Sequence, residues 1–190
     1  MKEKRSVDRS SALCPVEAAG SLDSVVRRWF QNPHRILSSY IRGDMTVIDL
    51  GCGPGFFTME MARLLGERGK IIAADIQQGM LDIVKGKIEE HGYENKIETH
   101  LCTDSSIGVT AKADFILAFY VIHEMKDQRR VFNELRTVIK QDGLLYISEP
   151  KFHVTREKFN TMTETMKECG FIPEHHLGSV LSRVVTARPA

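Results

Sequence analysis

The chain has 190 residues, of which 42% are hydrophobic and 27% are charged, and its formal net charge is +1. This length and composition are those of one soluble globular domain with a sizeable core. The near-neutral charge provides no basic field for nucleic acid, and no apolar run in the sequence approaches the length of about 18 residues that crosses a membrane. The charged start also lacks the apolar segment of a secretory signal. We therefore expect a cytoplasmic protein without nucleic-acid or membrane partners.

The first 43 residues contain two candidate helices. Apolar side chains recur at helical spacing from Leu22 to Phe30. A second helix is expected to begin at Pro33, with Asn32 as its cap, and to continue to Gly43.

The stretch from Val47 to Thr58 reads Val-Ile-Asp-Leu-Gly-Cys-Gly-Pro-Gly-Phe-Phe-Thr. The run Met45–Leu50 is typical of a strand buried on both faces of a parallel sheet. Three glycines at every second position then predict a loop whose backbone turns sharply and comes close to a ligand. Helical spacing starts at Phe56. A strand, a glycine loop and a helix in this order indicate a nucleotide-type site.

The spacing of the glycines also bears on which nucleotide is bound. A dinucleotide fingerprint, G-x-G-x-x-G, would need a third glycine where Phe56 stands. A phosphate-binding loop would need a following Gly-Lys-Ser/Thr, which is missing. The Asp49 carboxylate would repel a pyrophosphate, whereas a ligand that carries an ammonium group would be attracted to it. A nicotinamide oxidoreductase is therefore disfavoured.

Further strand candidates alternate with helix candidates along the rest of the chain. The expected strands are Lys70–Ala74, Ile97–Leu101, Ala113–Phe119 and Gly143–Ser148, followed by a closing hairpin of residues 171–175 and 179–187. The expected helices are Gln78–His91, Gln128–Lys140 and Thr155–Cys169, with stops at Gly92, Gly143 and Gly170. Acids follow several strands, at the edge where open α/β sheets bind ligands: Asp75, Asp104 and Glu149.

From about Asp44 to Glu149 these motifs resemble the class I S-adenosylmethionine-dependent methyltransferases. The resemblance implies an α/β, Rossmann-like, doubly wound and mostly parallel seven-stranded sheet, with an antiparallel C-terminal hairpin and helices on both faces. It implies a single methyltransferase domain over residues 1–190. Residues 1–43 are then expected to form a helical segment that covers the site. Within it Trp29 and Phe30 are interpreted as a core-facing stripe, and an aromatic lid over the site is the alternative.

The resemblance also assigns roles in binding S-adenosylmethionine. The glycine loop lies along the methionine part, Asp75 accepts from the ribose hydroxyls, and Asp104 accepts from the adenine amino group. A carboxylate that takes two hydroxyl hydrogen bonds is a sound physical basis for the second role. The full set of expected cofactor-binding residues is Asp49, Gly51, Cys52, Gly53, Gly55, Phe57, Asp75, Ile76, Asp104, Ser105 and Phe119.

Methyl transfer requires the protein to position the acceptor and to exclude water. A base is needed only if the acceptor starts protonated. The candidate catalytic residues are Tyr120 and His123, after the fourth strand, and Glu149, after the fifth. His123 is the best base because an ordinary imidazole titrates near pH 6.5; capping or packing is the alternative role.

The expected acceptor is a small molecule, which an aromatic lid would suit. The short chain leaves little room for the inserted segments from which family members usually build their specificity, so the sequence does not identify the acceptor. Several alternatives stay open: a non-catalytic S-adenosylmethionine-binding subunit or sensor, a protein methyltransferase, and an arsenite-type enzyme with Cys14 as a thiol ligand. A metal site would need His123, Glu149 and His153 to converge, and the main interpretation includes no metal. The scattered cysteines indicate neither a disulfide framework nor a zinc ribbon. The sequence leaves the oligomeric state open, a homodimer included.

Overall fold

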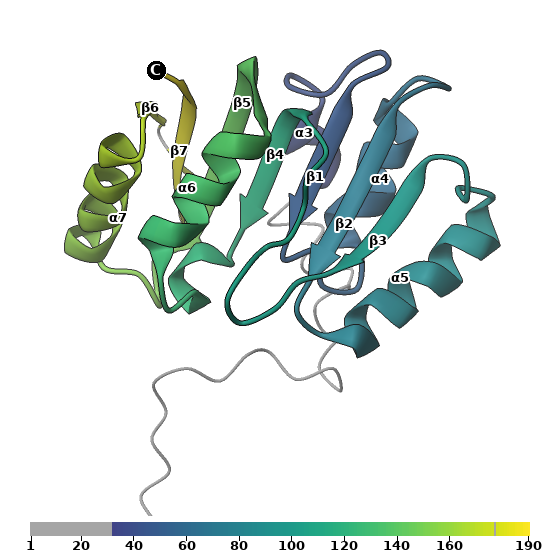
Figure 1. The fold of residues 1–190 in the computed structure, drawn as a ribbon, viewed down its shortest axis with the longest axis horizontal. Coiled ribbons are helices and arrows are strands. Elements are labelled where there is room, and N and C mark those ends of the chain that lie inside the picture. Colours follow the sequence, from purple (N-terminus) through teal and green to yellow (C-terminus); the bar gives the residue numbers. More distant parts are fainter. Residues whose placement is uncertain (1–31, 177) are drawn as a thin grey trace, which may run out of the picture.

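The computed structural model describes residues 32–176 and 178–190. In these residues seven strands form one sheet in the order β3-β2-β1-β4-β5-β7-β6 (Figure 1). The strands are β1 (Thr46–Leu50), β2 (Lys70–Asp75), β3 (Ile97–Leu101), β4 (Ala113–Phe119), β5 (Ile139–Pro150), β6 (Phe171–His176) and β7 (Ser182–Pro189).

The directions of the strands confirm the predicted fold class. The five strands from β3 to β5 pair in parallel, whereas β7 runs antiparallel both to β5 and to β6. The second strand of the closing hairpin, β7, therefore lies between β5 and β6, and the first strand, β6, forms the edge of the sheet. The parallel strands β1 and β2 are buried almost throughout, as is expected of strands that helices cover on both faces.

Helices lie on both sides of the sheet. The described helices are α3 (Pro33–Leu37), α4 (Phe56–Leu64), α5 (Gln78–His91), the short 3₁₀ helix η2 (Ile122–Glu124), α6 (Gln128–Val138) and α7 (Arg156–Glu168). Buried side chains of α6 and α7 belong to one core cluster, and those of α3, α4 and α5 belong to another. In Figure 1 α6 and α7 lie in front of the sheet, with α3 and α4 behind it.

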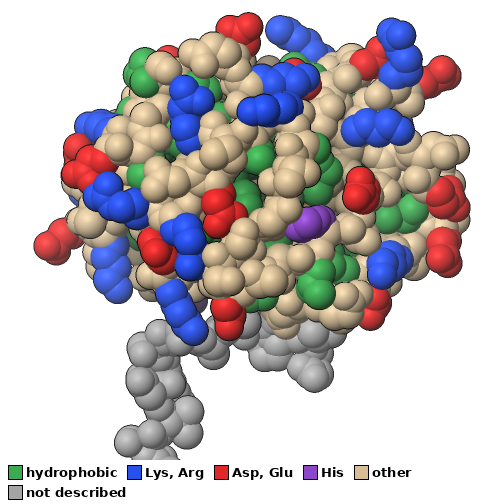
Figure 2. Space-filling view, in the orientation of Figure 1, with side chains coloured by type: hydrophobic (Ala, Val, Ile, Leu, Met, Phe, Trp, Pro, Cys, Tyr) green, Lys and Arg blue, Asp and Glu red, His purple; other side chains and the backbone are tan. Residues whose placement is uncertain are grey.

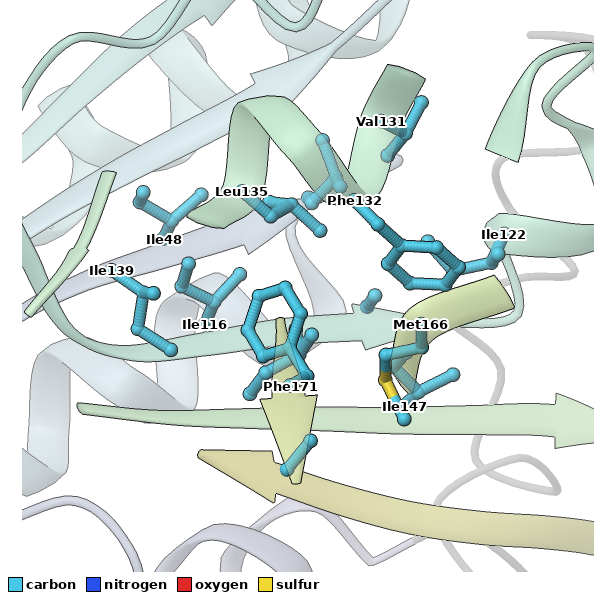
Figure 3. Packing of buried hydrophobic residues seen from close by; sticks show 14 of the residues in the cluster. Ile48, Ile116, Ile122, Val131, Phe132, Leu135, Ile139, Ile147, Met166 and Phe171 are labelled. Carbon is cyan, nitrogen blue, oxygen red and sulfur yellow. The ribbon is translucent and has the colours of Figure 1, made fainter. Parts of the chain in front are cut away.

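The core beneath α6 and α7 is built from aliphatic and aromatic side chains. Phe132 and Leu135 of α6 are fully buried, and they face Ile116 and Ile147 of the sheet (Figure 3). Met166 of α7 fills the space beside them. Each such side chain contributes roughly 1.5 to 3 kcal/mol through the removal of its apolar surface from water. This packing fixes β4 and β5, whose ends carry candidate site residues.

An aromatic group stabilises the opposite face. The Tyr40 ring stacks on Phe115 of β4, with ring centroids 5.9 Å apart, and meets Tyr146 of β5 edge-on at 5.4 Å. Leu37 of α3 is fully buried nearby in the same cluster. The segment that precedes β1 is therefore packed on the sheet from α3 onward.

Several element boundaries differ from the prediction; the strand expected at residues 179–187, for example, is β7 at Ser182–Pro189. The Gly143 stop was wrong: α6 ends at Val138, and β5 begins at Ile139 and continues through Gly143. Ile139 pairs with Ala113, and the register then shifts before Phe115 pairs with Leu144. The predicted helix up to Gly43 is also shorter, because α3 ends at Leu37 and a turn follows.

The carboxyl ends of β1, β2 and β4 point to the same edge of the sheet, at the bottom of Figure 1.

Within residues 32–176 and 178–190, no helix has both the length and the apolar character that a membrane span requires. Basic and acidic side chains are interspersed on the face drawn in Figure 2, and no large area of that face carries a single sign of charge.

Candidate functional site

The loop between β1 and α4 follows the edge at which the strands end. Gly51, Gly53 and Gly55 all have positive φ, of 70°, 52° and 86°. The Gly51 and Cys52 backbone N–H groups donate to the carbonyl of Ala74 on β2, at 2.8 and 3.1 Å. Left-handed backbone is readily available to glycine and costly for other residues. The predicted glycine loop is therefore present, and it is fixed against β2.

The space around these glycines is not uniform. A Cβ on Gly51 would lie 2.5 Å from the Val121 side chain, and a Cβ on Gly55 would lie 3.2 Å from Val84. A Cβ on Gly53 would meet no atom within 4 Å. The loop is thus closed against the protein at Gly51 and open at Gly53, which is the geometry of a backbone that a ligand can approach.

Asp49 lies beneath this loop, near the end of β1. It is 2% exposed, and its Oδ2 accepts from the Thr58 hydroxyl at 2.6 Å. Thr58 is in the first turn of α4 and is fully buried. The sequence interpretation missed Thr58; its position nine residues after Asp49, on the helix that the loop opens, was the available signal.

Asp75 connects β2 to the glycine loop. It is 8% exposed; its Oδ2 accepts from the Gly53 N–H and its Oδ1 from the Gln77 N–H, both at 2.9 Å. Each carboxylate oxygen has a second lone pair with which it can accept from a ligand hydroxyl. Asp75, the residue that is expected to bind the ribose, therefore lies beside Gly53 on the open side of the loop. The half-buried Ile76 follows it in the chain.

The segment after β3 forms a turn in which Thr103 pairs with Ser106. Asp104 and Ser105 are exposed on this turn. Two residues of α6 hold the turn: Arg130 donates to the Asp104 carbonyl at 3.0 Å, and Glu134 accepts from the Ser106 hydroxyl at 2.8 Å. Neither α6 residue was predicted, since nothing in the sequence connects that helix to this turn.

Two thiols lie among these residues. Burial raises the pKa of Cys102 to about 12, and the charges of Asp75 and Glu134 act in the same direction. Burial also raises the pKa of Cys52 well above its ordinary value, reinforced by Asp49 and Asp75. Both side chains are therefore neutral thiols near neutral pH, and neither has the reactivity of a thiolate nucleophile. Cys14, the thiol of the arsenite-type alternative, and Trp29 and Phe30, for which a core stripe or a lid was considered, fall outside the described residues.

The end of β4 carries stacked aromatic rings. The Phe119 ring lies 4.4 Å from the rings of both Phe57 and Tyr120. Tyr120 has a φ of 62° and is the one non-glycine residue with positive φ in the described part of the chain. Its hydroxyl lies 2.5 Å from the Ser182 hydroxyl of β7. Strained backbone of this kind concentrates at functional sites, and here it fixes the direction of the Tyr120 ring.

A second short polar contact at this edge joins His123 to Glu149. The His123 Nδ1 lies 2.5 Å from Glu149 Oε2, and the His123 backbone N–H donates to Oε1 at 3.3 Å. Glu149 is fully buried, whereas 22% of the His123 side chain is exposed. Burial lowers the pKa of His123, but the hydrogen bond to Glu149 and the charges of Glu149 and Glu124 outweigh it, so this pKa lies above its ordinary value.

The arrangement places the predicted residues in two adjoining groups. Asp49, the glycine loop and Asp75 form one group, and Tyr120, His123 and Glu149 form the other. His153 stacks on the His123 ring with centroids 5.8 Å apart. Even so, among the residues that the structure describes, no three His, Cys, Asp or Glu side chains are arranged to hold a metal ion.

The strand order, the glycine loop after β1 and the acid at the end of β2 are those of a class I S-adenosylmethionine-dependent methyltransferase. A family model described as a methyltransferase domain matches residues 41–183, which make up most of the chain. The chain therefore belongs to the methyltransferase-domain family, and S-adenosylmethionine is the cofactor that this class uses.

Two relatives illustrate the range of the family. The ubiquinone/menaquinone biosynthesis C-methyltransferase UbiE of Shewanella frigidimarina is 26% identical over 142 residues, which are 69% of this chain and 54% of that protein. Arsenite methyltransferase of Mus musculus is 26% identical over 165 residues, which are 77% of this chain and 44% of that protein. The chain spans about half the length of these curated relatives.

Solved structures share the fold. A S-adenosylmethionine-dependent methyltransferase from Aquifex aeolicus superposes with a TM-score of 0.84 at 22% identity, over 94% of this chain and all of that one. The [4+2]-cyclase SpnF superposes with a TM-score of 0.70 at 16% identity, over 83% of this chain and 80% of that one. Since a cyclase has this fold as well, the fold alone does not determine the reaction.

Proposed function

We propose that the protein transfers a methyl group from S-adenosylmethionine to a small-molecule acceptor. The observation that carries this proposal is that a cofactor-type edge, formed by the open glycine loop and Asp75, adjoins a histidine–carboxylate pair at the ends of β4 and β5. A binding subunit or sensor would need the first group and not the second. The same contact between His123 and Glu149 therefore favours an enzyme.

The residues suit the parts of the cofactor. The buried Asp49 carboxylate suits the ammonium group of the methionine part, the open backbone at Gly53 suits close approach of the ligand, and Asp75 suits two ribose hydroxyls. When bound, S-adenosylmethionine supplies an electrophilic methyl group on a sulfonium. We assign the remaining expected contacts as follows: Gly51, Cys52, Gly55, Phe57 and Phe119 line the methionine side, and Ile76, Asp104 and Ser105 the nucleoside side.

An organic acceptor is favoured over a metalloid. Cys52 and Cys102, the thiols at this edge, are neutral because of their raised pKa values, so neither is an activated thiolate. Tyr120 and Phe119 instead offer stacked ring surface, which suits a planar or apolar acceptor and helps to keep water out.

We also propose that residues 1–190 form one domain in which residues 1–43 cover the site. Support comes from the described end of that segment, where Leu37 and Tyr40 pack on the sheet. Removal of residues 1–31 is expected to keep the fold but to lower the rate of methyl transfer. Circular dichroism and a methyl-transfer assay on the shortened chain would test this. An unchanged rate of transfer would refute the proposal that the segment covers the site.

Cofactor binding is tested first, by isothermal titration with S-adenosylhomocysteine and with NADH. We expect micromolar affinity for the former and no binding of the latter. Asp75→Ala should weaken binding by about 1 to 3 kcal/mol, the scale of a lost buried hydrogen-bond partner. Asp82→Ala, which removes an exposed carboxylate from α5, is the matched control and should bind normally. Equal affinity for the Asp75 and Asp82 variants would refute the ribose role.

Methyl transfer is tested second, with methyl-labelled cofactor and a panel of phenols, activated carbon acids, amines, thiols and arsenite. We expect labelled product from at least one organic small molecule. If the cofactor binds and no acceptor, including proteins of a cell extract, takes up label, then a binding subunit or sensor is the correct interpretation. A labelled protein band would indicate a protein methyltransferase instead.

A further inference from the structure

Building on the proposed function, we infer that Glu149 is a positioning residue that presents His123 Nε2 as the base, and that the acceptor loses a proton from an acidic O–H or C–H. This separates the roles of two residues at one site. It also narrows the substrate class to phenols, enols and carbon acids.

The carboxylate partner indicates which ring nitrogen of His123 carries the hydrogen. Glu149 Oε2 lies 2.5 Å from His123 Nδ1, and an ionised carboxylate can only accept. The neutral ring therefore holds its hydrogen on Nδ1 and leaves Nε2 as the acceptor. Because Glu149 is fully buried and also accepts from the His123 backbone N–H, it holds this residue at two points, the ring Nδ1 and the backbone. Its own carboxylate is shielded from any acceptor molecule.

Charged groups around the ring come from four elements. Glu149 on β5 and Glu124 on η2 favour the protonated ring. His153, which follows β5, stacks on the ring and would oppose protonation when charged. Arg183 on β7 is opposite Glu149 in the strand pairing, but its guanidinium donates to the Val154 carbonyl at 2.7 Å. The two carboxylates therefore dominate.

Other candidate bases are less suitable. The Tyr120 hydroxyl lies 2.5 Å from the Ser182 hydroxyl, which already occupies it. Cys52 and Cys102 are neutral thiols. Among these candidates His123 thus combines a partly exposed ring with a carboxylate partner that holds its Nδ1.

The need for a base defines the acceptor. A lone pair on a thioether, a tertiary amine or trivalent arsenic attacks without losing a proton, so a fixed histidine would add nothing. With an acidic O–H or C–H, His123 Nε2 takes the proton while the electron pair that it leaves forms the new bond to the methyl carbon. The bond between the methyl carbon and sulfur breaks, and its electron pair stays on sulfur. The imidazolium later releases its proton to solvent.

The first test needs no methyl donor. In protein labelled with ¹⁵N-histidine, long-range ¹H–¹⁵N correlation reports the tautomer and the titration midpoint of His123, with His123→Gln for assignment. We expect the Nδ1–H form in the wild type. Glu149→Gln should lower the midpoint and mix the tautomers, whereas His153→Gln, the matched control, should keep the Nδ1–H form. The Nε2–H form in the wild type would overturn the inference, even if Glu149→Gln did not fold.

The second test uses turnover. The rate should rise with pH through the His123 pKa, since the base must be neutral, and Glu149→Gln should shift this rise to lower pH and lower kcat by about 10- to 10⁴-fold. His123→Ala should lose about 10²- to 10⁴-fold with acidic acceptors while cofactor affinity is kept. Methylation of a thioether or of arsenite at a rate that His123→Ala leaves unchanged would overturn the inference. Failure of the wild type to bind S-adenosylhomocysteine would instead refute the proposed function.

Discussion

Gly51 and Gly53 have the same left-handed backbone but opposite surroundings, so they form a matched pair for mutation. Gly51→Ala would force a Cβ to within 2.5 Å of Val121, whereas Gly53→Ala would enter open space. Both changes carry the strain of left-handed alanine, about 1 to 2 kcal/mol. Gly51→Ala should lose at least about 1 kcal/mol more, the scale of overpacking.

Urea denaturation measures this difference in unfolding free energy. Titration with S-adenosylhomocysteine measures the loss of affinity in each variant. Relative to the stability that each variant loses, Gly53→Ala should lose more affinity than Gly51→Ala, because its methyl group would occupy the space next to the loop backbone. Equal unfolding free energies for the two variants would show that Val121 moves away at no cost.

At the residue scale, the sequence predicted those site residues that stand in local motifs. The acids Asp49 and Asp75 and the three glycines were recognisable from spacing within one stretch of chain. Thr58 and Ser182 were missed because each contacts a site residue through the tertiary fold: Ser182 reaches Tyr120 across 62 positions of sequence. Glu134 was missed because it holds the turn of Asp104 and Ser105 from a distant helix. The contact between His123 and Glu149 was equally hidden, although both residues were candidates. Proximity between the ends of two strands follows from sheet pairing, which composition does not encode.

At the element scale, α6 links the sheet to the turn after β3. Its cap, Asp127, accepts from the Arg130 N–H at 3.0 Å, and Arg130 and Glu134 hold that turn. We predict that Asp127→Ala costs about 0.5 to 2 kcal/mol of stability and also speeds hydrogen exchange at Ile107 and Gly108, whose N–H groups donate to Glu134.

The matched control is Thr155→Ala, which removes the cap of α7, where the Thr155 hydroxyl accepts from the Lys158 N–H. It should cost a similar amount of stability without changing exchange at Ile107 and Gly108. Faster exchange there in both variants would mean that the turn responds to global stability and not to α6.

The elements themselves were predicted well where local signals agree. The ranges Ile97–Leu101, Ala113–Phe119 and Gln78–His91 match the structure, and Gly92 ends α5 with a φ of 69°. The start of β5 was wrong because pairing with Ala113 extends a strand into residues that continue a helical pattern. Tertiary pairing outweighed local preference there.

At the scale of the whole molecule, the strand order determines which residues meet. The insertion of β7 between β5 and β6 brings Ser182 opposite Pro150, and this places its hydroxyl within reach of Tyr120. The sequence showed a closing hairpin, but its position in the sheet came from the resemblance to a family. Alternating short strands look the same whether they pair at an edge or inside a sheet.

The last prediction concerns the pH dependence of global stability. The folded-state pKa of His123 lies above its ordinary value because of Glu149 and Glu124, so the folded protein binds this proton more tightly than the unfolded chain. The resulting stabilisation is fully present below the unfolded pKa of about 6.5 and is lost as pH rises through the folded pKa. Relative to His123→Gln, the wild type should therefore gain most unfolding free energy in mildly acidic solution, and the difference should shrink through neutral to alkaline pH. Urea denaturation of both proteins across that range measures it, and carboxylates common to both cancel. A difference that grows with pH would mean that burial keeps His123 neutral, and that Glu149 does not stabilise its charge.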